Sequence, residues 1–159
     1  MLGFGVLGGA AALAFGAVAV VGGGSTALAD DPQPELVENF EYPGAAAIEA
    51  ARGIKLKKGD GHILFVDCAQ NANQLQVEST AFPAGRNLFC FKIVGDKGNI
   101  TMELAEAFLV HGNDYNVVAT WTDENGKVHN TPLRKNNPTG IGEGVTGQPG
   151  SLIEFNATR

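Results

Sequence analysis

Two apolar runs of strand length, each carrying one of the chain's two cysteines, most constrain how this sequence can fold. The first is residues 61–68, with the letters GHILFVDC, and the second is residues 88–94, with the letters LFCFKIV. In an exported chain we expect two neighbouring strands joined by a disulfide between Cys68 and Cys90. With 21 residues between the two cysteines, the loop-closure model gives that bond a stabilisation of roughly 3 kcal/mol.

The N-terminus has the pattern of an export signal. The first 29 residues contain no charged side chain, and residues 1–21 form an apolar run long enough to span a membrane. Small and polar residues follow, and Ala27-Leu28-Ala29 before Asp30 matches an A-x-A cleavage site. We therefore predict a signal peptide at residues 1–29 and a secreted, extracellular protein with no membrane span after cleavage. The usual basic start is missing, so either the true start lies upstream or the amino terminus supplies the charge. An uncleaved membrane anchor is the alternative.

The negative charge is concentrated near the N-terminus. The formal net charge is -6 at pH 7, and residues 30–51 contain six acidic and no basic side chains. From Arg52 onward, 11 acidic residues are matched by 11 basic ones. The domain is therefore neutral overall, and the leader carries the whole charge imbalance. We therefore expect neither nucleic acid nor an anionic membrane surface as a partner.

Residues 30–58 form an acidic, alanine-rich segment that we predict to be an interaction segment. Residues 30–41 combine two prolines and many acids with few large apolar groups, so we expect an extended tail there. Residues 45–52 are strong helix formers followed by Gly53, a residue suited to end a helix. So short a helix is marginal alone. It must dock either on its own domain, as a cap on the sandwich, or on another protein.

Residues 59–159 contain short runs of alternating apolar and polar residues separated by turn signals, and no convincing long amphipathic helix. Seven or eight such strands predict an all-β domain, an immunoglobulin-like antiparallel β-sandwich with one disulfide. A β-barrel is the weaker alternative. Removal of the signal leaves 130 residues, which is enough for one domain of this kind.

Three local patterns make this prediction specific. The run at residues 62–68 is apolar on both faces, which predicts a central strand. Asn125-Gly126 predicts a tight hairpin, because both residues accept positive φ. Alternation in the remaining runs predicts which side chains face the core. These are Leu75, Val77, Phe89, Phe91, Ile93, Ile153, Phe155 and Ala157.

Residues 134–150 form the longest expected connection, with five glycines and two prolines. Adjacent strands of a sandwich do not need a connection of this length. Long loops are usually functional or flexible, so we expect either a binding loop or a mobile connection.

No motif in the chain points to catalysis, a metal or a cofactor. The three histidines, His62, His111 and His129, lie outside recognisable metal-binding or nucleophile motifs. Asp60, His62 and Asp67 are the most suggestive acid–base set, but strand alternation points His62 and Asp67 to opposite faces. The two cysteines lack the short ligand spacing of a zinc site. We predict a protein that is not an enzyme and that holds no metal and no cofactor.

Four short motifs, together with the signal, resemble small secreted proteins of filamentous actinobacteria. They are Tyr42-Pro43-Gly44-Ala45, Gly53-Ile54-Lys55-Leu56, Gly59-Asp60-Gly61-His62-Ile63 and Val66-Asp67-Cys68. Among these proteins, the chain most resembles the adaptor subunit of umbrella toxin particles. The resemblance covers residues 40–70 and the general layout of the rest. It implies a non-enzymatic bridge whose extended N-terminal segment inserts into the repeat rings of a large secreted toxin and whose sandwich carries a lectin subunit. A tail that orders on binding suits such an insertion.

Partner contacts are expected in the N-terminal segment and in the long connection. In the segment they are Tyr42, Pro43, Ala46, Ile48, Ile54 and Leu56, and in the connection they are Arg134, Lys135 and Ile141. The alternative is a stand-alone secreted carbohydrate-binding or inhibitor module that uses the glycine-rich connection and leaves the leader dispensable.

Overall fold

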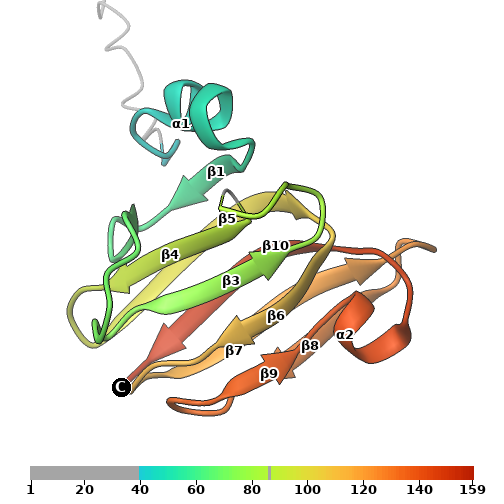
Figure 1. The fold of residues 1–159 in the computed structure, drawn as a ribbon. Coiled ribbons are helices and arrows are strands. Elements are labelled where there is room, and N and C mark those ends of the chain that lie inside the picture. Colours follow the sequence, from blue (N-terminus) through green and yellow to red (C-terminus); the bar gives the residue numbers. More distant parts are fainter. Residues whose placement is uncertain (1–39, 86) are drawn as a thin grey trace, which may run out of the picture. The chain divides into compact units, whose positions relative to one another are not determined.

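The computed structural model describes residues 40–85 and 87–159, which form two five-stranded antiparallel sheets (Figure 1). Sheet A has the order β1 (Lys55–Gly59), β5 (Lys97–Ala105), β10 (Gly150–Thr158), β7 (Asn116–Asp123) and β8 (Val128–Pro132). Sheet B has the order β2 (Ile63–Val66), β4 (Leu88–Ile93), β3 (Leu75–Ser79), β6 (Ala107–His111) and β9 (Pro138–Gly140). Two short helices, α1 (Ala45–Arg52) and α2 (Glu143–Thr146), complete the described elements. The all-β antiparallel sandwich predicted from the sequence is confirmed.

The predicted signal at residues 1–29 and the acidic stretch at residues 30–39 lie outside the described residues. Within the described ranges, no helix combines the length and apolar character needed to cross a bilayer.

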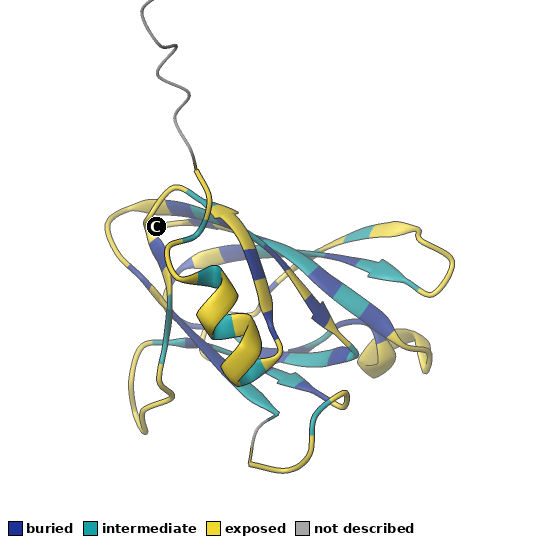
Figure 2. Cartoon of the chain, turned by 90° about the horizontal axis from the view of Figure 1, so that it is seen from above, coloured by how far each residue is buried: buried dark blue, intermediate teal, exposed yellow. Residues whose placement is uncertain are grey.

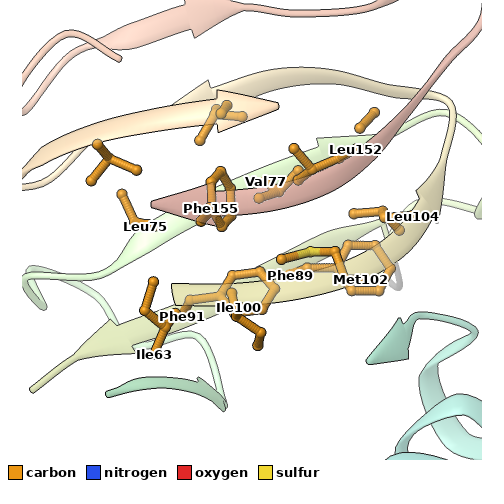
Figure 3. Close-up of a cluster of buried hydrophobic side chains, with 14 of the residues drawn as sticks. Ile63, Leu75, Val77, Phe89, Phe91, Ile100, Met102, Leu104, Leu152 and Phe155 are labelled. Atoms are coloured by element: carbon orange, nitrogen blue, oxygen red, sulfur yellow. The ribbon is translucent and has the colours of Figure 1, made fainter. Parts of the chain in front are cut away.

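The core lies between the sheets and is built from alternating apolar side chains (Figure 3). In β4, Phe89 and Phe91 are fully buried, as predicted. Phe91 meets Phe155 of sheet A edge to face, with ring centroids 5.6 Å apart. Such a pair contributes about 0.5–1.5 kcal/mol to stability, in addition to the contribution from the apolar area that each ring buries. Contacts between apolar side chains of the two sheets therefore hold the sheets together.

The disulfide is formed as predicted, and the two cysteine-bearing runs are neighbours. Cys68 is bonded to Cys90, and β2 pairs with β4 so that Val66 lies opposite Cys90. The predicted central position of residues 62–68 is wrong, because β2 is an edge strand of sheet B. Leu64 is accordingly 37% exposed. On this edge strand, Phe65 packs against the core and its ring centroid lies 5.4 Å from the Arg52 guanidinium of α1.

The β7–β8 hairpin is confirmed, but its turn differs from the tight turn that Asn125-Gly126 predicted. Of the two residues, only Gly126 has a positive φ, at 76°. The backbone N–H of Gly126 donates to the carbonyl oxygen of Asp123 at 3.0 Å. The Asp123 side chain also accepts from the N–H groups of Asn125 and Lys127. A wider loop organised by one aspartate therefore replaces a two-residue turn.

The last strand contains a bulge that the alternation pattern missed. The register of β10 shifts between Leu152 and Glu154 against both neighbouring strands. As a result Leu152 is fully buried, whereas Ile153 is only partly buried. The predicted inward position of Ile153 is wrong, because an inserted residue reverses the alternation on one side of it. Phe155 and Ala157 do face the core.

Residues 134–150 are not one long irregular connection, because they contain regular elements. They contain β9, which pairs with β6, and the short helix α2. Ile141 between them is 0% exposed. With β9 and the other short strands, the described residues form ten strands, more than the predicted seven or eight.

Candidate functional site

Helix α1 covers the side of the sandwich on which the edge strands β1 and β2 lie (Figure 2). The helix ends at Gly53, which has a φ of 79° and donates its N–H to the carbonyl oxygen of Glu49 at 2.8 Å. Ala45 and Ile48 pack against the core, while no residue of α1 is fully buried. The helix therefore closes the sandwich with one face and exposes the other.

Two side chains attach this helix and its leading turn to the sheets. The backbone N–H of Tyr42 donates to the carbonyl oxygen of Lys57 in β1 at 3.0 Å. The Tyr42 hydroxyl accepts from the N–H of Phe65 in β2 at 2.7 Å. At the other end, Arg52 Nη2 donates to the carbonyl oxygen of Leu88 at 2.7 Å. The edge strands thus use Tyr42 to satisfy backbone groups that would otherwise face solvent.

A groove of about 770 Å³ opens between α1 and β1. We call it the α1–β1 groove; residues 41–42, 44–47, 49 and 55–58 line it. Tyr42, Ala45 and Ala46 supply apolar surface, and Leu56 of the core reaches the same groove. Its polar lining consists of Glu41, Glu49, Lys55, Lys57 and Lys58. An apolar floor with a charged rim is suited to an extended polypeptide with apolar and acidic side chains.

The lysines of β1 are exposed and set the local charge. Lys57 Nζ lies 3.1 Å from Glu103 Oε2 of the neighbouring strand. The hydrogen bond and charge of Lys57 lower the pKa of Glu103, and Lys55 adds to the effect. Because both partners of this pair are about half exposed, it contributes little to stability. The lysines therefore remain accessible to a partner.

The structure places the predicted contact residues in different environments. Tyr42 and Ala46 line the groove, and Pro43 is exposed in the turn before α1. Ile48 is partly buried against the core. Ile54, Leu56 and Ile141 are 0%, 2% and 0% exposed, so their side chains belong to the core, although Leu56 also lines the groove. Arg134 and Lys135 are exposed, but they lie in the β8–β9 turn and do not line the groove.

The boundary predicted at residues 58 and 59 falls inside β1. Strand β1 pairs with β5 along the sheet, and the described residues belong to one compact unit. Lys55, Leu56 and Lys57 alternate between exposed and buried positions, and β1 is an edge strand of sheet A. No sequence pattern indicated the contacts of Tyr42 and Arg52, because these contacts join segments distant in the chain.

Asp60 and Asp123 make hydrogen bonds within the fold. Asp60 accepts hydrogen bonds from the N–H groups of His62 and Asn99, at 3.0 and 2.9 Å. Partial burial raises the pKa of Asp60, but these bonds and the nearby imidazole outweigh it and lower the pKa overall. His129 Nε2 lies 3.0 Å from Asp123 Oδ2 and its ring stacks on Trp121, a contact that the sequence did not indicate. Within the described ranges, no group of three or more histidine, cysteine or acidic side chains could hold a metal.

Comparison with known proteins adds no further assignment: no family model matches the chain, and no curated protein is significantly similar to it.

Proposed function

We propose that this protein is a secreted, non-enzymatic adaptor. In this proposal its N-terminal segment, together with the α1–β1 groove, binds a large repeat-containing secreted protein. Its sandwich carries a second, lectin-like subunit of an extracellular antibacterial toxin complex. The observation that carries the proposal is the α1–β1 groove, since all the residues that line it belong to the predicted interaction segment at residues 30–58.

Charge and position support a polypeptide as the occupant of the groove. Lys55, Lys57 and Lys58 follow one another along an edge strand, beside the apolar surface of Tyr42 and Ala46. A partner segment with apolar anchors and carboxylates would match both features. In this proposal the acidic leader contacts a second region of the same partner.

The disulfide and the absence of a membrane-spanning helix from the described residues are compatible with an extracellular location. Secretion itself rests on the sequence pattern at residues 1–29. The N-terminal residue of the protein recovered from culture medium tests it directly. Protein beginning at Asp30 supports cleavage after Ala29, whereas protein found only in the membrane fraction contradicts it.

The first test of the adaptor proposal is the native mass of the protein in culture supernatant of its host. A complex of much higher mass than the chain, containing a long repeat protein, supports the proposal. A single species near the monomer mass refutes a stable assembly. That result would favour the stand-alone carbohydrate-binding or inhibitor module.

Two matched substitutions on α1 locate the contact. Ala46 lines the groove, whereas Ala50 is exposed on the same helix and does not. Arginine is a good helix former at either position. We expect Ala46→Arg to remove the partner from the complex and Ala50→Arg to retain it. Equal behaviour of the two variants, both folded by circular dichroism, would exclude the groove as the binding surface.

The test of the leader should remove residues 30–39 only. A longer deletion through Arg52 would also remove α1, whose contacts with Phe65 and Leu88 close the sandwich. We expect the shorter deletion to weaken complex formation while the sandwich stays folded. Full binding by this variant would show that the acidic segment is dispensable and would contradict its role.

A further inference from the structure

A second cavity, of about 520 Å³, lies where the β2–β3 loop, the end of β6 and the β8–β9 turn meet. We call it the amide cavity, because side-chain carboxamides dominate its lining. They belong to Asn71, Asn73, Gln74, Gln76 and Asn136. Its volume is within the range of small-molecule sites, roughly 300–1,000 Å³. None of its lining residues lines the α1–β1 groove.

Hydrogen bonds hold the three walls of the amide cavity together. Asn136 Nδ2 donates to Asp114 Oδ1 at 2.8 Å, and the N–H of Asp114 donates to Asn73 Oδ1 at 3.2 Å. Gln74 closes the β2–β3 loop, since it accepts from the N–H of Ala69 and donates to the carbonyl oxygen of Asp67, both at 3.0 Å. The lining is therefore ordered before any ligand binds, which lowers the entropic cost of binding.

Two of the five carboxamides, those of Asn71 and Gln76, make no hydrogen bond to any described residue. Both also line an adjoining cavity of about 460 Å³, together with Cys68 and Leu88. The two cavities thus share their polar centre, and the disulfide and Leu88 supply apolar surface beside it. A ligand spanning both would meet free donors and acceptors next to a nonpolar wall.

The charges of the lining side chains limit which class of ligand the two cavities can bind. None of the described residues that line the two cavities is a lysine or arginine, so among them an anionic ligand would find only the imidazole of His111 as a basic group. A carboxamide both donates and accepts hydrogen bonds, as a sugar hydroxyl does, and Asp114 adds a carboxylate acceptor. The C–H face of a sugar ring is suited to the apolar wall. Asn113, between two lining residues, also has a buried Nδ2 with no partner among the described residues.

We propose that the amide cavity binds a neutral oligosaccharide, with Asn71 and Gln76 as the central hydrogen-bonding groups. This site goes beyond the adaptor proposal and does not depend on it. It differs from the binding loop that the sequence suggested, since only Asn136 of residues 134–150 lines it. An extended peptide is the competing ligand, because its backbone amides can pair with the same groups.

The test begins with the full secreted protein on an array of immobilised neutral glycans and of extended peptides. The soluble form of any bound glycan is then titrated while NMR follows the backbone and side-chain amide signals. We expect shifts at Asn71, Gln76 and Asn136, and unchanged signals at Ala46 in the α1–β1 groove. Binding of peptides alone, no binding of any neutral glycan, or shifts confined to the groove would each overturn the proposal.

Gln76→Ala and Asn71→Gly separate this site from a general surface effect. Removing Gln76 leaves no partner unsatisfied, and glycine accepts the positive φ of 57° at position 71. Each variant should remain folded and bind the glycan roughly three- to tenfold more weakly, the effect of one lost neutral hydrogen bond. Gln148→Ala, exposed and outside both cavities, is the control and should bind normally. Unchanged affinity in both cavity variants would refute the assignment.

Discussion

Arg52 joins α1 to the sandwich, and its replacement tests whether the helix is part of the folded domain. Its Nη2 donates to the carbonyl oxygen of Leu88 at 2.7 Å. Its guanidinium also lies 5.4 Å from the ring centroid of Phe65 and 5.5 Å from that of Phe89. A hydrogen bond from a charged donor contributes about 1.5–3 kcal/mol, and each cation–π contact about 0.5–1 kcal/mol at a partly exposed site.

Arg52→Met keeps most of the apolar stem and removes the charge and the donor. Arg52 is only partly buried, so we discount the sum of these contributions for solvent and expect a loss of about 2 kcal/mol. For a domain of this size the loss corresponds to a decrease in Tm of about 8 °C. The stability of Arg52→Lys should lie between that of Arg52→Met and that of the unmodified protein, because an ammonium group retains the charge but not the planar geometry.

Urea unfolding at neutral pH with the disulfide intact measures this effect. The matched control is Arg134→Met, since Arg134 is exposed and its side chain makes no hydrogen bond or ion pair with the described residues. It should unfold within about 0.5 kcal/mol of the unmodified protein. A similarly small change for Arg52→Met would refute the reasoning. In that case the Arg52 side chain would not hold α1 in place. The reason for avoiding the longer deletion through Arg52 would then be weakened.

Three further predictions concern the turn after α1, the disulfide and the β7–β8 hairpin. Gly53→Ala should lower stability by more than about 1–2 kcal/mol in thermal unfolding, because Gly53 has a φ of +79° and an added Cβ would lie 2.3 Å from Phe82 Cε1; an unchanged Tm would contradict this conformation. Reduction of the Cys68–Cys90 bond should lower the free energy of unfolding by about 3 kcal/mol, and an unchanged urea midpoint after complete reduction would contradict it. The hydrogen bond from the imidazole of His129 lowers the pKa of Asp123 below its ordinary 3.8. The Asp123–His129 contact therefore stabilises the fold above pH 3.8, and this stabilisation is lost as the pH falls through the lower pKa that Asp123 has in the folded state. Asp123→Asn should therefore lose less stability than the unmodified protein between about pH 5 and about pH 2, and equal acid sensitivity of the two would argue against the contact.

The fold class followed from the sequence because its signals are local. Leu75 and Val77 alternate with polar residues, and this alternation directly determines which side chains a strand buries. The two cysteine-bearing runs were recognised as neighbours because an even pair in an exported chain has one simple pairing. The same reasoning failed at Ile153, since a bulge is a property of the pairing with adjacent strands and leaves little trace in one strand's own sequence.

The candidate site could be predicted only in part. Tyr42 and Ala46 were expected as contact residues, and both line the α1–β1 groove. Ile54 and Leu56 were expected beside them because they are apolar and close in sequence, and both are buried in the core, although Leu56 also lines the groove. The amide cavity had no sequence signal at all, because its carboxamides come from three separate segments.

The sequence by itself determined the β-sandwich, its disulfide, the short helix and the separation of an acidic leader from a neutral domain. These features depend on periodicity, composition and spacing, which are properties of neighbouring residues. The tertiary structure alone decided that β2 lies at an edge, that α1 closes the sandwich, and where the groove and the amide cavity form. The reason is physical: surfaces and cavities are formed by side chains brought together from distant segments, and their positions depend on strand order and register.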